Sequence, residues 1–128
     1  MSHQLIAVQP DKTPTPLPYT PAIKVGGFVY CSGAIGMDEN GQVVADFEAQ
    51  VRLTLERIRF VLKEAGSSMS HVVKATVFLT DMKNFDVMNG IYKTYFSQPF
   101  PARTCVAVSA LPKGAQVEIE VVAVQANI

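Results

Sequence analysis

The sequence has few charged residues, no excess of either sign of charge and no long uninterrupted apolar segment. Charged residues make up only 17% of the chain, and eleven basic side chains balance eleven acidic ones. Without a net charge the chain has no long-range field that would gather nucleic acid or anionic lipid, so no nucleic acid is expected as a partner. No segment approaches the roughly 18 uncharged apolar residues that a membrane span needs, so we expect a soluble protein with no membrane partner.

Cysteine and histidine are also scarce, with two of each. Residues 1–9 contain no arginine and too short an apolar run for a signal peptide, so Cys31 and Cys105 are predicted to be reduced thiols rather than a disulfide. The expected location is the cytoplasm, with the mitochondrial matrix as the alternative. His3 and His71 do not form zinc spacing with the cysteines, so no metal site is expected. Neither histidine has an evident reason to reach Cys105 and activate it as a nucleophile.

Apolar residues are abundant, at 48% of the chain. A length of 128 residues fits one domain, spanning 1–128, which should bury roughly two thirds of the surface of the unfolded chain. An ordinary soluble domain has about a quarter of its residues charged. Because this chain has fewer, part of its apolar surface is expected to lie against another subunit.

Residues 1–9 are predicted to form a first strand, and the segment after them is stiffened by proline. Five prolines stand between residues 10 and 21, where each removes an amide donor and fixes φ, so this segment cannot be a helix or a central strand. Tyr19 lies inside it. An aromatic side chain on such a segment is well placed to close over a pocket, and the alternative is that it only holds the loop to the surface.

Paired glycines and an Asn-Gly step predict antiparallel β structure up to residue 45. The Gly26–Gly27 pair supplies the positive φ of a tight turn between strands at 23–25 and 28–32. The Asn40–Gly41 step is a second turn signal. We therefore expect hairpins in this region.

The most regular helical pattern runs from Asp46 to Ala65, with Asp46 as the N-cap residue and Gly66 at the C′ position. Its apolar residues recur every three to four positions: Phe47, Val51, Leu55, Ile58, Leu62 and Ala65. Leu53 and Phe60 lie roughly opposite this stripe and face away from the core of the domain. They are either isolated surface side chains, which is the commoner case, or part of a subunit contact.

A strand, a second helix and two further strands follow. The strand has an apolar face formed by Val73, Ala75, Val77 and Leu79. The helix has Asn84 as a candidate cap and Gly90 in its interior, where glycine costs about 1 kcal/mol relative to alanine. Its apolar stripe is Phe85, Met88, Tyr92, Tyr95 and Phe96.

The chain ends with strands at about 102–109 and 116–125, which we expect to pair antiparallel. The order of elements predicts an α+β fold, a mixed β-sheet with two helices packed on one face.

The polar residues of these last strands suggest a site. Arg103 and Cys105 share the more polar face of the first strand, and Glu118 and Glu120 lie opposite the apolar face of the second. If both apolar faces meet the helices, all four residues share the face away from the helices. They then line a cavity completed by a neighbouring subunit, or form an exposed ion pair worth ~0–1 kcal/mol; the spacing favours neither. Arginine grips a carboxylate with a fixed fork and cannot form a Schiff base, which favours binding of an acid over covalent catalysis.

Three stretches of the C-terminal region form a recognisable signature: Pro101–Val106, Leu111–Lys113 and Val117–Val124. They closely resemble the C-terminal signature of the Rid (YjgF) family. The likeness extends over almost the whole chain, through Tyr19, Cys31 to Gly33, Glu64 to Gly66, Val73 to Leu79, and Asn89 with Tyr92. The resemblance implies a single Rid-like domain with a chorismate-mutase-like fold. It also implies a homotrimer with a central β-barrel and active sites in the clefts between subunits.

The resemblance further implies an enamine/imine deaminase, a hydrolase that converts 2-aminoacrylate and related 2-enamino and 2-imino acids to 2-oxo acids and ammonia without a cofactor. Carried over by position, Arg103 would bind the substrate carboxylate and Glu118 would orient or deprotonate the attacking water. The backbone of Cys105 would help to hold that water. The remaining substrate-binding residues would be Tyr19, Ser32, Gly33, Asn89 and Thr104.

Two positions depart from the family pattern, and a second class of function competes with the first. Leu17 stands where a glycine is usual and Gly36 replaces a common proline, which bears on the entrance of the site and the preferred substrate side chain. The alternative function is a non-catalytic protein that binds small ligands, or a translation-inhibiting, endoribonuclease-like protein. The zero net charge argues against the RNA-directed version.

Overall fold

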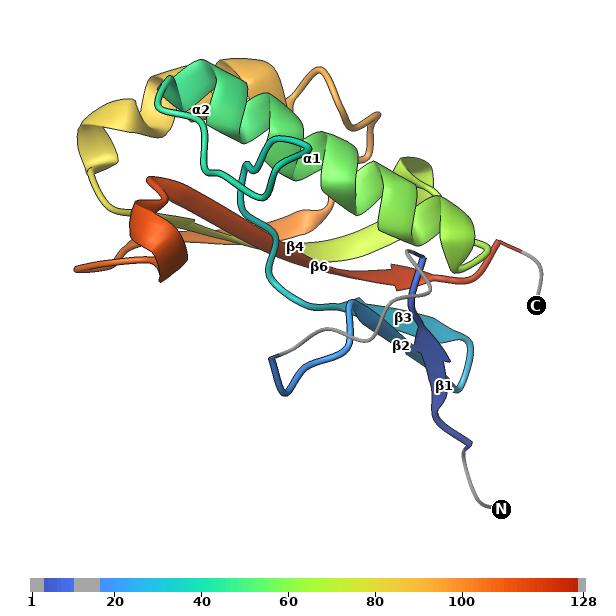
Figure 1. Cartoon of the computed structure of the whole chain (residues 1–128). Coiled ribbons are helices and arrows are strands. Elements are labelled where there is room, and N and C mark those ends of the chain that lie inside the picture. Colours follow the sequence, from blue (N-terminus) through green and yellow to red (C-terminus); the bar gives the residue numbers. More distant parts are fainter. Residues whose placement is uncertain (1–3, 11–16, 127–128) are drawn as a thin grey trace.

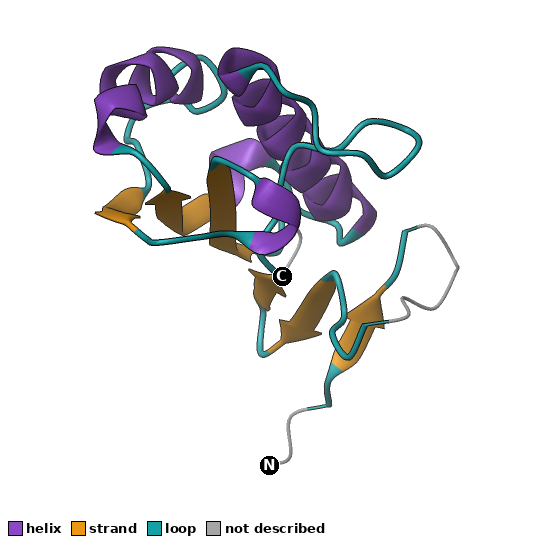
Figure 2. Ribbon diagram, turned by 60° about the vertical axis from the view of Figure 1, so that its left-hand side comes forward, coloured by secondary structure: helices purple, strands orange, loops and turns teal. Residues whose placement is uncertain are grey.

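The structure is a computed structural model that describes residues 4–10 and 17–126. One six-stranded sheet carries two helices on one face, and Figures 1 and 2 show both helices on the same side of it. The strands are β1 (Ile6–Val8), β2 (Ala22–Val25), β3 (Phe28–Cys31), β4 (Val72–Leu79), β5 (Ala102–Ala107) and β6 (Val117–Val124). The helices are α1 (Phe47–Glu64) and α2 (Phe85–Tyr92), with short 3₁₀ turns η1 (Met69–His71), η2 (Met82–Asn84) and η3 (Pro112–Gly114). The predicted α+β fold with a mixed sheet is confirmed.

The N-terminal strands form as the glycine signals predict. Gly26 and Gly27 have φ of +60° and +85° and connect β2 to β3, which pair antiparallel. The Asn40–Gly41 turn is also present, with an isolated bridge between Met37 and Val43, but residues 32–45 form no regular hairpin strands. β1 pairs with β2, while residues 1–3, which include His3, and residues 11–16 lie outside the described part of the chain.

Helix α1 begins and ends where its capping residues predict. Asp46 Oδ2 accepts a hydrogen bond from the Ala49 amide at 2.9 Å, and Gly66 follows the helix with φ of +79°. The predicted apolar stripe faces the sheet, and its members are buried except for the half-buried Phe47. On the outer side, Leu53 is half-buried and Phe60 is 40% exposed, with the Arg57 guanidinium 5.7 Å from its ring centroid. No helix among residues 4–10 and 17–126 is long and apolar enough to cross a membrane.

The order of strands differs from the prediction. The sheet runs β1-β2-β3-β6-β4-β5, so β4 lies between the last two strands, pairing antiparallel with β6 and parallel with β5. The expected antiparallel pair of the last two strands is therefore wrong. β4 and β6 are the two eight-residue strands with the most continuous buried face, and they occupy the middle of the helix-covered part of the sheet. β5 is left at the edge.

Two local predictions around β4 and α2 also fail. A register shift between Val72 and Lys74 leaves Val72 buried at 7% exposed and Val73 exposed at 43%, because an irregularity in a strand interrupts the alternation of its faces. Asn84 stands at the N-cap position of α2 but makes no capping hydrogen bond with its side chain. Instead Asp81 caps the preceding turn η2 by accepting a hydrogen bond from the Lys83 amide at 2.9 Å.

Candidate functional site

The register of β4 with its neighbours decides the face on which each candidate residue lies. In the parallel ladder Arg103 is opposite Ala75 and Cys105 is opposite Val77. Val77 is in turn opposite Ile119 of β6. Because residues opposite one another share a face, and these partners are fully buried under the helices, Arg103 and Cys105 lie on the helix side.

The two glutamates lie on the other side of the sheet. Glu118 is opposite Phe78 and Glu120 is opposite Thr76, on what we call the open face, the face of the sheet that α1 and α2 do not cover. The expectation that Arg103 shares a face with the glutamates is therefore wrong. Within the described part of the chain, the alternative cross-strand ion pair does not form either. The shared face was expected because the side of β5 with Ala102, Thr104 and Val106 was assumed to meet the helices, whereas in the structure the side with Arg103 and Cys105 does. The ion pair also required β5 and β6 to be neighbours, and β4 lies between them.

Side chains of α2 hold Arg103 in a group that we call the arginine cluster, consisting of Arg103, Phe85, Asn89 and Tyr92. Arg103 Nη1 donates a hydrogen bond to Asn89 Oδ1 at 2.6 Å. Its guanidinium carbon lies 4.9 Å from the Tyr92 ring centroid and 5.7 Å from that of Phe85. The three α2 residues are four and three positions apart, a spacing that places them on one face of a helix. The amide acceptor and the two rings together orient the guanidinium.

The arginine cluster borders a pocket of about 300 Å³. Its lining consists of Asn89, Tyr92, Lys93, Phe100, Pro101 and Arg103. The aromatic rings and the proline give it apolar walls, and the two cationic groups give it a preference for an anion. A few convergent polar groups in an otherwise apolar pocket are typical of a small-molecule site, and these suit a small organic acid.

Cys105 is not an activated thiol in this setting. It is half-buried against the core, and burial raises the pKa of its thiol while the Arg103 charge lowers it in part. His71 lies before β4 with Nδ1 2.7 Å from Ser68 Oγ, whereas Cys105 is opposite Val77, towards the other end of the strand. A raised pKa leaves the thiol protonated at neutral pH, which argues against a nucleophilic role.

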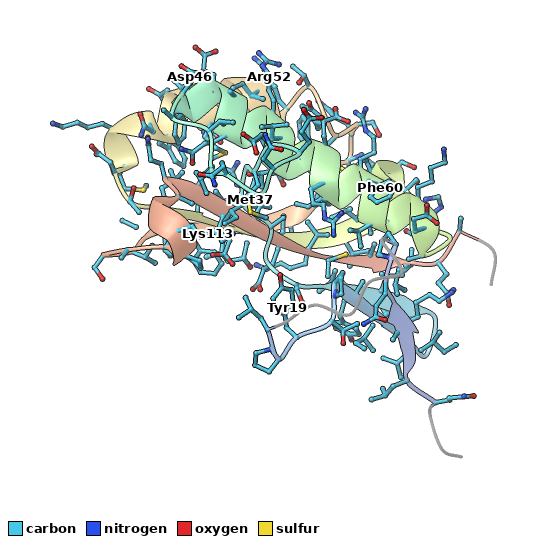
Figure 3. All side chains as sticks on the ribbon, viewed as in Figure 1. Tyr19, Met37, Asp46, Arg52, Phe60 and Lys113 are labelled. Carbon is cyan, nitrogen blue, oxygen red and sulfur yellow. The ribbon has the colours of Figure 1, made fainter. Side chains whose placement is uncertain are left out.

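On the open face, Glu118 contacts Gly33, and we call these two residues the glutamate cluster together with Ser32, next to Gly33, and Tyr19, next to the Thr20 carbonyl that Ser32 binds. The Glu118 carboxylate occupies the space where a Cβ at position 33 would lie. It can therefore pack against the backbone of residue 33 in this way because that residue is glycine. Ser32 Oγ donates to the Thr20 carbonyl at 2.5 Å, which holds the residue next to Tyr19. Tyr19 is 49% exposed and lies on the side of the sheet away from the helices (Figure 3).

The surroundings of Glu118 on the open face change the pKa of its carboxyl. Burial raises the pKa of its carboxyl above the ordinary glutamate value, and the neighbouring Glu120 carboxylate raises it further. Thr104 is on the same face, where its Oγ1 accepts a hydrogen bond from Lys74 Nζ at 2.9 Å. Thr104 is thus separated by the sheet from Arg103, although the two are adjacent in sequence.

The structure brings the predicted site residues together in two groups rather than one. Arg103 and Asn89 are in the arginine cluster, the four members of the glutamate cluster are on the open face, and Cys105 and Thr104 belong to neither. The prediction of site residues missed Phe85, Tyr92, Lys93, Phe100 and Pro101. Phe85 and Tyr92 had a usable signal in their helical spacing to Asn89, and Tyr92 and Pro101 were among the residues that carried the family resemblance. Among the residues that the structure describes, no group of three or more histidine, cysteine or acidic side chains could hold a metal ion.

Comparison with known proteins gives consistent similarities. The family model described as Endoribonuclease L-PSP matches residues 11–125. The human 2-iminobutanoate/2-iminopropanoate deaminase is 46% identical over 110 residues, covering 84% of this chain and 80% of that protein. Among solved structures, RidA from the Antarctic bacterium Psychrobacter has a TM-score of 0.88 at 41% identity, covering 93% of this chain and 98% of that one. Escherichia coli TdcF with bound serine has a TM-score of 0.86 at 33% identity, covering 94% and 99%.

Proposed function

This chain belongs to the Endoribonuclease L-PSP family, also named Rid or YjgF, and we propose that it is an imine deaminase of that family. The proposed reaction is hydrolysis of 2-iminopropanoate, 2-iminobutanoate and related 2-imino acids, including those formed from 2-aminoacrylate. The products are a 2-oxo acid and ammonia. Support comes from the similarity to the human deaminase and from the anion-binding pocket beside Arg103.

We propose that the complete site forms between subunits of a homotrimer. In one chain the sheet separates the arginine cluster from the glutamate cluster, so a site that contains both needs a second copy. The open face offers apolar surface for such contacts: Phe28 is 40% exposed, Tyr30 48% and Val106 40%. Packing these faces together would give the central β-barrel that the sequence resemblance implies.

The proposed chemistry needs little machinery. An imine carbon is already electrophilic, so a bound water placed against it can add across the C=N bond. Arg103 would hold the substrate carboxylate, and the Glu118 carboxylate would take a proton from that water and pass it to the imine nitrogen. The resulting carbinolamine then loses ammonia to give the 2-oxo acid. Because burial and the Glu120 carboxylate raise the pKa of Glu118 above the ordinary glutamate value, its carboxylate is a stronger base than an ordinary one, which suits it to this role.

The position of Arg103 is the observation that carries the proposal, and its replacement is the test. In a coupled assay a pyridoxal-phosphate dehydratase releases 2-aminoacrylate and the formation of ammonia is followed. Arg103→Ala should reduce the deaminase contribution by about 10²–10⁴-fold, because two charged hydrogen bonds of roughly 1.5–3 kcal/mol each are lost. The matched control is Arg59→Ala, which removes an arginine 4.9 Å from the Tyr95 ring on the outer helix surface and should retain activity.

Retained activity in folded Arg103→Ala would rule out the assignment of Arg103. A wild-type protein that binds pyruvate but does not accelerate ammonia release would instead support the binding-only alternative. The cytoplasmic location expected from the sequence stays a prediction.

A further inference from the structure

A buried glutamine lies beneath the segment that leads from β3 to α1. Residues 33–45, here called the crossing segment, pass from the open-face site to the N-terminus of α1. Gln50, in the first turns of α1, is only 1% exposed. A carboxamide buried this completely is costly unless both of its ends are hydrogen-bonded.

Both ends of the Gln50 side chain have partners, and both partners are backbone groups. Its Nε2 donates to the Val44 carbonyl in the crossing segment at 2.8 Å. Its Oε1 accepts from the Gln116 amide, one residue before β6, at 2.9 Å. One side chain thus joins α1, the crossing segment and the start of the strand that carries Glu118.

The same segment is held tightly between α1 and β6 at its other end. Gly36 is buried, and a Cβ there would overlap the Gln50 backbone, so this departure from the family pattern allows close approach of the segment to α1. The Val44 amide donates to the Gly36 carbonyl at 3.2 Å. Ala34 and Ile119 exchange two backbone hydrogen bonds of 2.9 and 3.1 Å. Gly33, next to Ala34, therefore has its position relative to Glu118 set by this packing.

We propose that Gln50 is a positioning residue for the glutamate cluster: it fixes the crossing segment against β6 and thereby sets the contact of Gly33 with the Glu118 carboxylate. This inference rests on the proposed function only for its kinetic consequence. A second tie lies at the outer turn of the segment, where Lys113 Nζ donates to the Gly41 carbonyl at 3.2 Å and lies 3.8 Å from Met37 Sδ (Figure 3). That tie is exposed, so the buried one is expected to dominate.

The other end of the same helix provides a matched control. Ser67, just beyond α1, donates from Oγ to the Val124 carbonyl at the end of β6 at 2.6 Å. It ties the end of α1 to β6 as Gln50 does, but among the described residues its side chain hydrogen-bonds neither to the crossing segment nor to Glu118. Ser67→Ala therefore reports what the loss of a helix-to-strand hydrogen bond does to the protein in general.

The test uses Gln50→Met, which keeps the length of the side chain and removes both hydrogen bonds. The kcat for imine hydrolysis should fall by about 10–100-fold, since small displacements of a catalytic group cost this much, while KM changes less than about twofold because Arg103 is untouched. Hydrogen–deuterium exchange should accelerate at the Ala34 and Ile119 amides. Ser67→Ala should leave kcat and the exchange at these two amides unchanged.

Unchanged kcat in folded Gln50→Met, or an equal fall in Ser67→Ala, would overturn the proposal. If Gln50→Met does not fold, Gly36→Ala takes its place, because it displaces the crossing segment from α1 and should give the same loss of kcat and the same faster exchange. A wild-type protein without deaminase activity would contradict the proposed function alone. The exchange at Ala34 and Ile119 would then still decide whether Gln50 positions the segment.

Discussion

The arginine cluster and the glutamate cluster lie on opposite faces of one sheet, and they are built in different ways. Arg103 is fixed by side chains, a carboxamide and two aromatic rings that one face of α2 presents to an edge strand. Glu118 lies on β6, and its carboxylate packs against the backbone at Gly33, where the crossing segment begins. Substitutions in α2 should therefore alter the contacts of Arg103 directly. The contact of Glu118 with Gly33 should change when a substitution displaces the backbone of the crossing segment.

The two clusters also suit different chemical roles. The arginine cluster offers a permanent cation in a pocket with apolar walls, which suits recognition of a carboxylate. The glutamate cluster offers a carboxylate with a raised pKa, which suits proton transfer. In the proposed function, recognition and proton transfer therefore lie on opposite sides of the sheet, and we expect an assembly of subunits to bring them together.

The strongest test of this division mixes two inactive variants. Arg103→Ala and Glu118→Gln should each lose about 10²-fold or more of the deaminase activity. If each site takes its arginine from one subunit and its glutamate from the next, random trimers of an equal mixture restore about a quarter of the wild-type sites. The measurement is the activity of the two proteins unfolded and refolded together. The control is the sum of the variants refolded separately, and recovery no greater than that sum would show that the clusters do not combine between subunits.

A smaller effect is expected in the pH dependence of the glutamate cluster. Glu118 acts as a base only when ionised, and both burial and Glu120 raise its pKa, so activity should fall with decreasing pH from above the ordinary glutamate range. Glu120→Gln removes the like charge and should move this acid limb of the kcat/KM profile to lower pH. Lys74, a cation of the open face that donates to Thr104, is unchanged in the variant. An acid limb that stays in place or moves to higher pH would contradict the assignment of Glu118 as the base.

The smallest effect is expected in the arginine cluster, at Tyr92. This residue is 5% exposed, and its hydroxyl has no hydrogen-bond partner among the described residues. Tyr92→Phe removes the hydroxyl and keeps a ring beside Arg103, so the free energy of unfolding should stay the same or rise by up to about 1 kcal/mol. Denaturant unfolding of the two proteins measures the difference. A loss of more than about 1 kcal/mol would mean that the hydroxyl has a stabilising partner in the assembled protein.

Local sequence signals were sufficient for most elements of the fold. The Asp46 cap, the apolar stripe of α1 and Gly66 define the ends and the buried face of that helix. The Gly26–Gly27 pair defines the β2–β3 hairpin. These features depend on residues close together in sequence, where capping, backbone preference and periodicity act directly. The residue pattern of the C-terminal strands was likewise sufficient to indicate the family.

The neighbours of β5 were decided only by the tertiary structure. Alternation along the strand separated Arg103 from Thr104, but the assumption that the side with Ala102, Thr104 and Val106 meets the helices was wrong. Both sides of this strand carry a mixture of polar and apolar residues, so its own sequence does not decide which side is covered. Pairing with β4 turned Arg103 towards α2 and left Glu118 on the open face. Strand order depends on contacts between residues far apart in the chain, and a strand's own sequence records which residues share a face but not what that face covers.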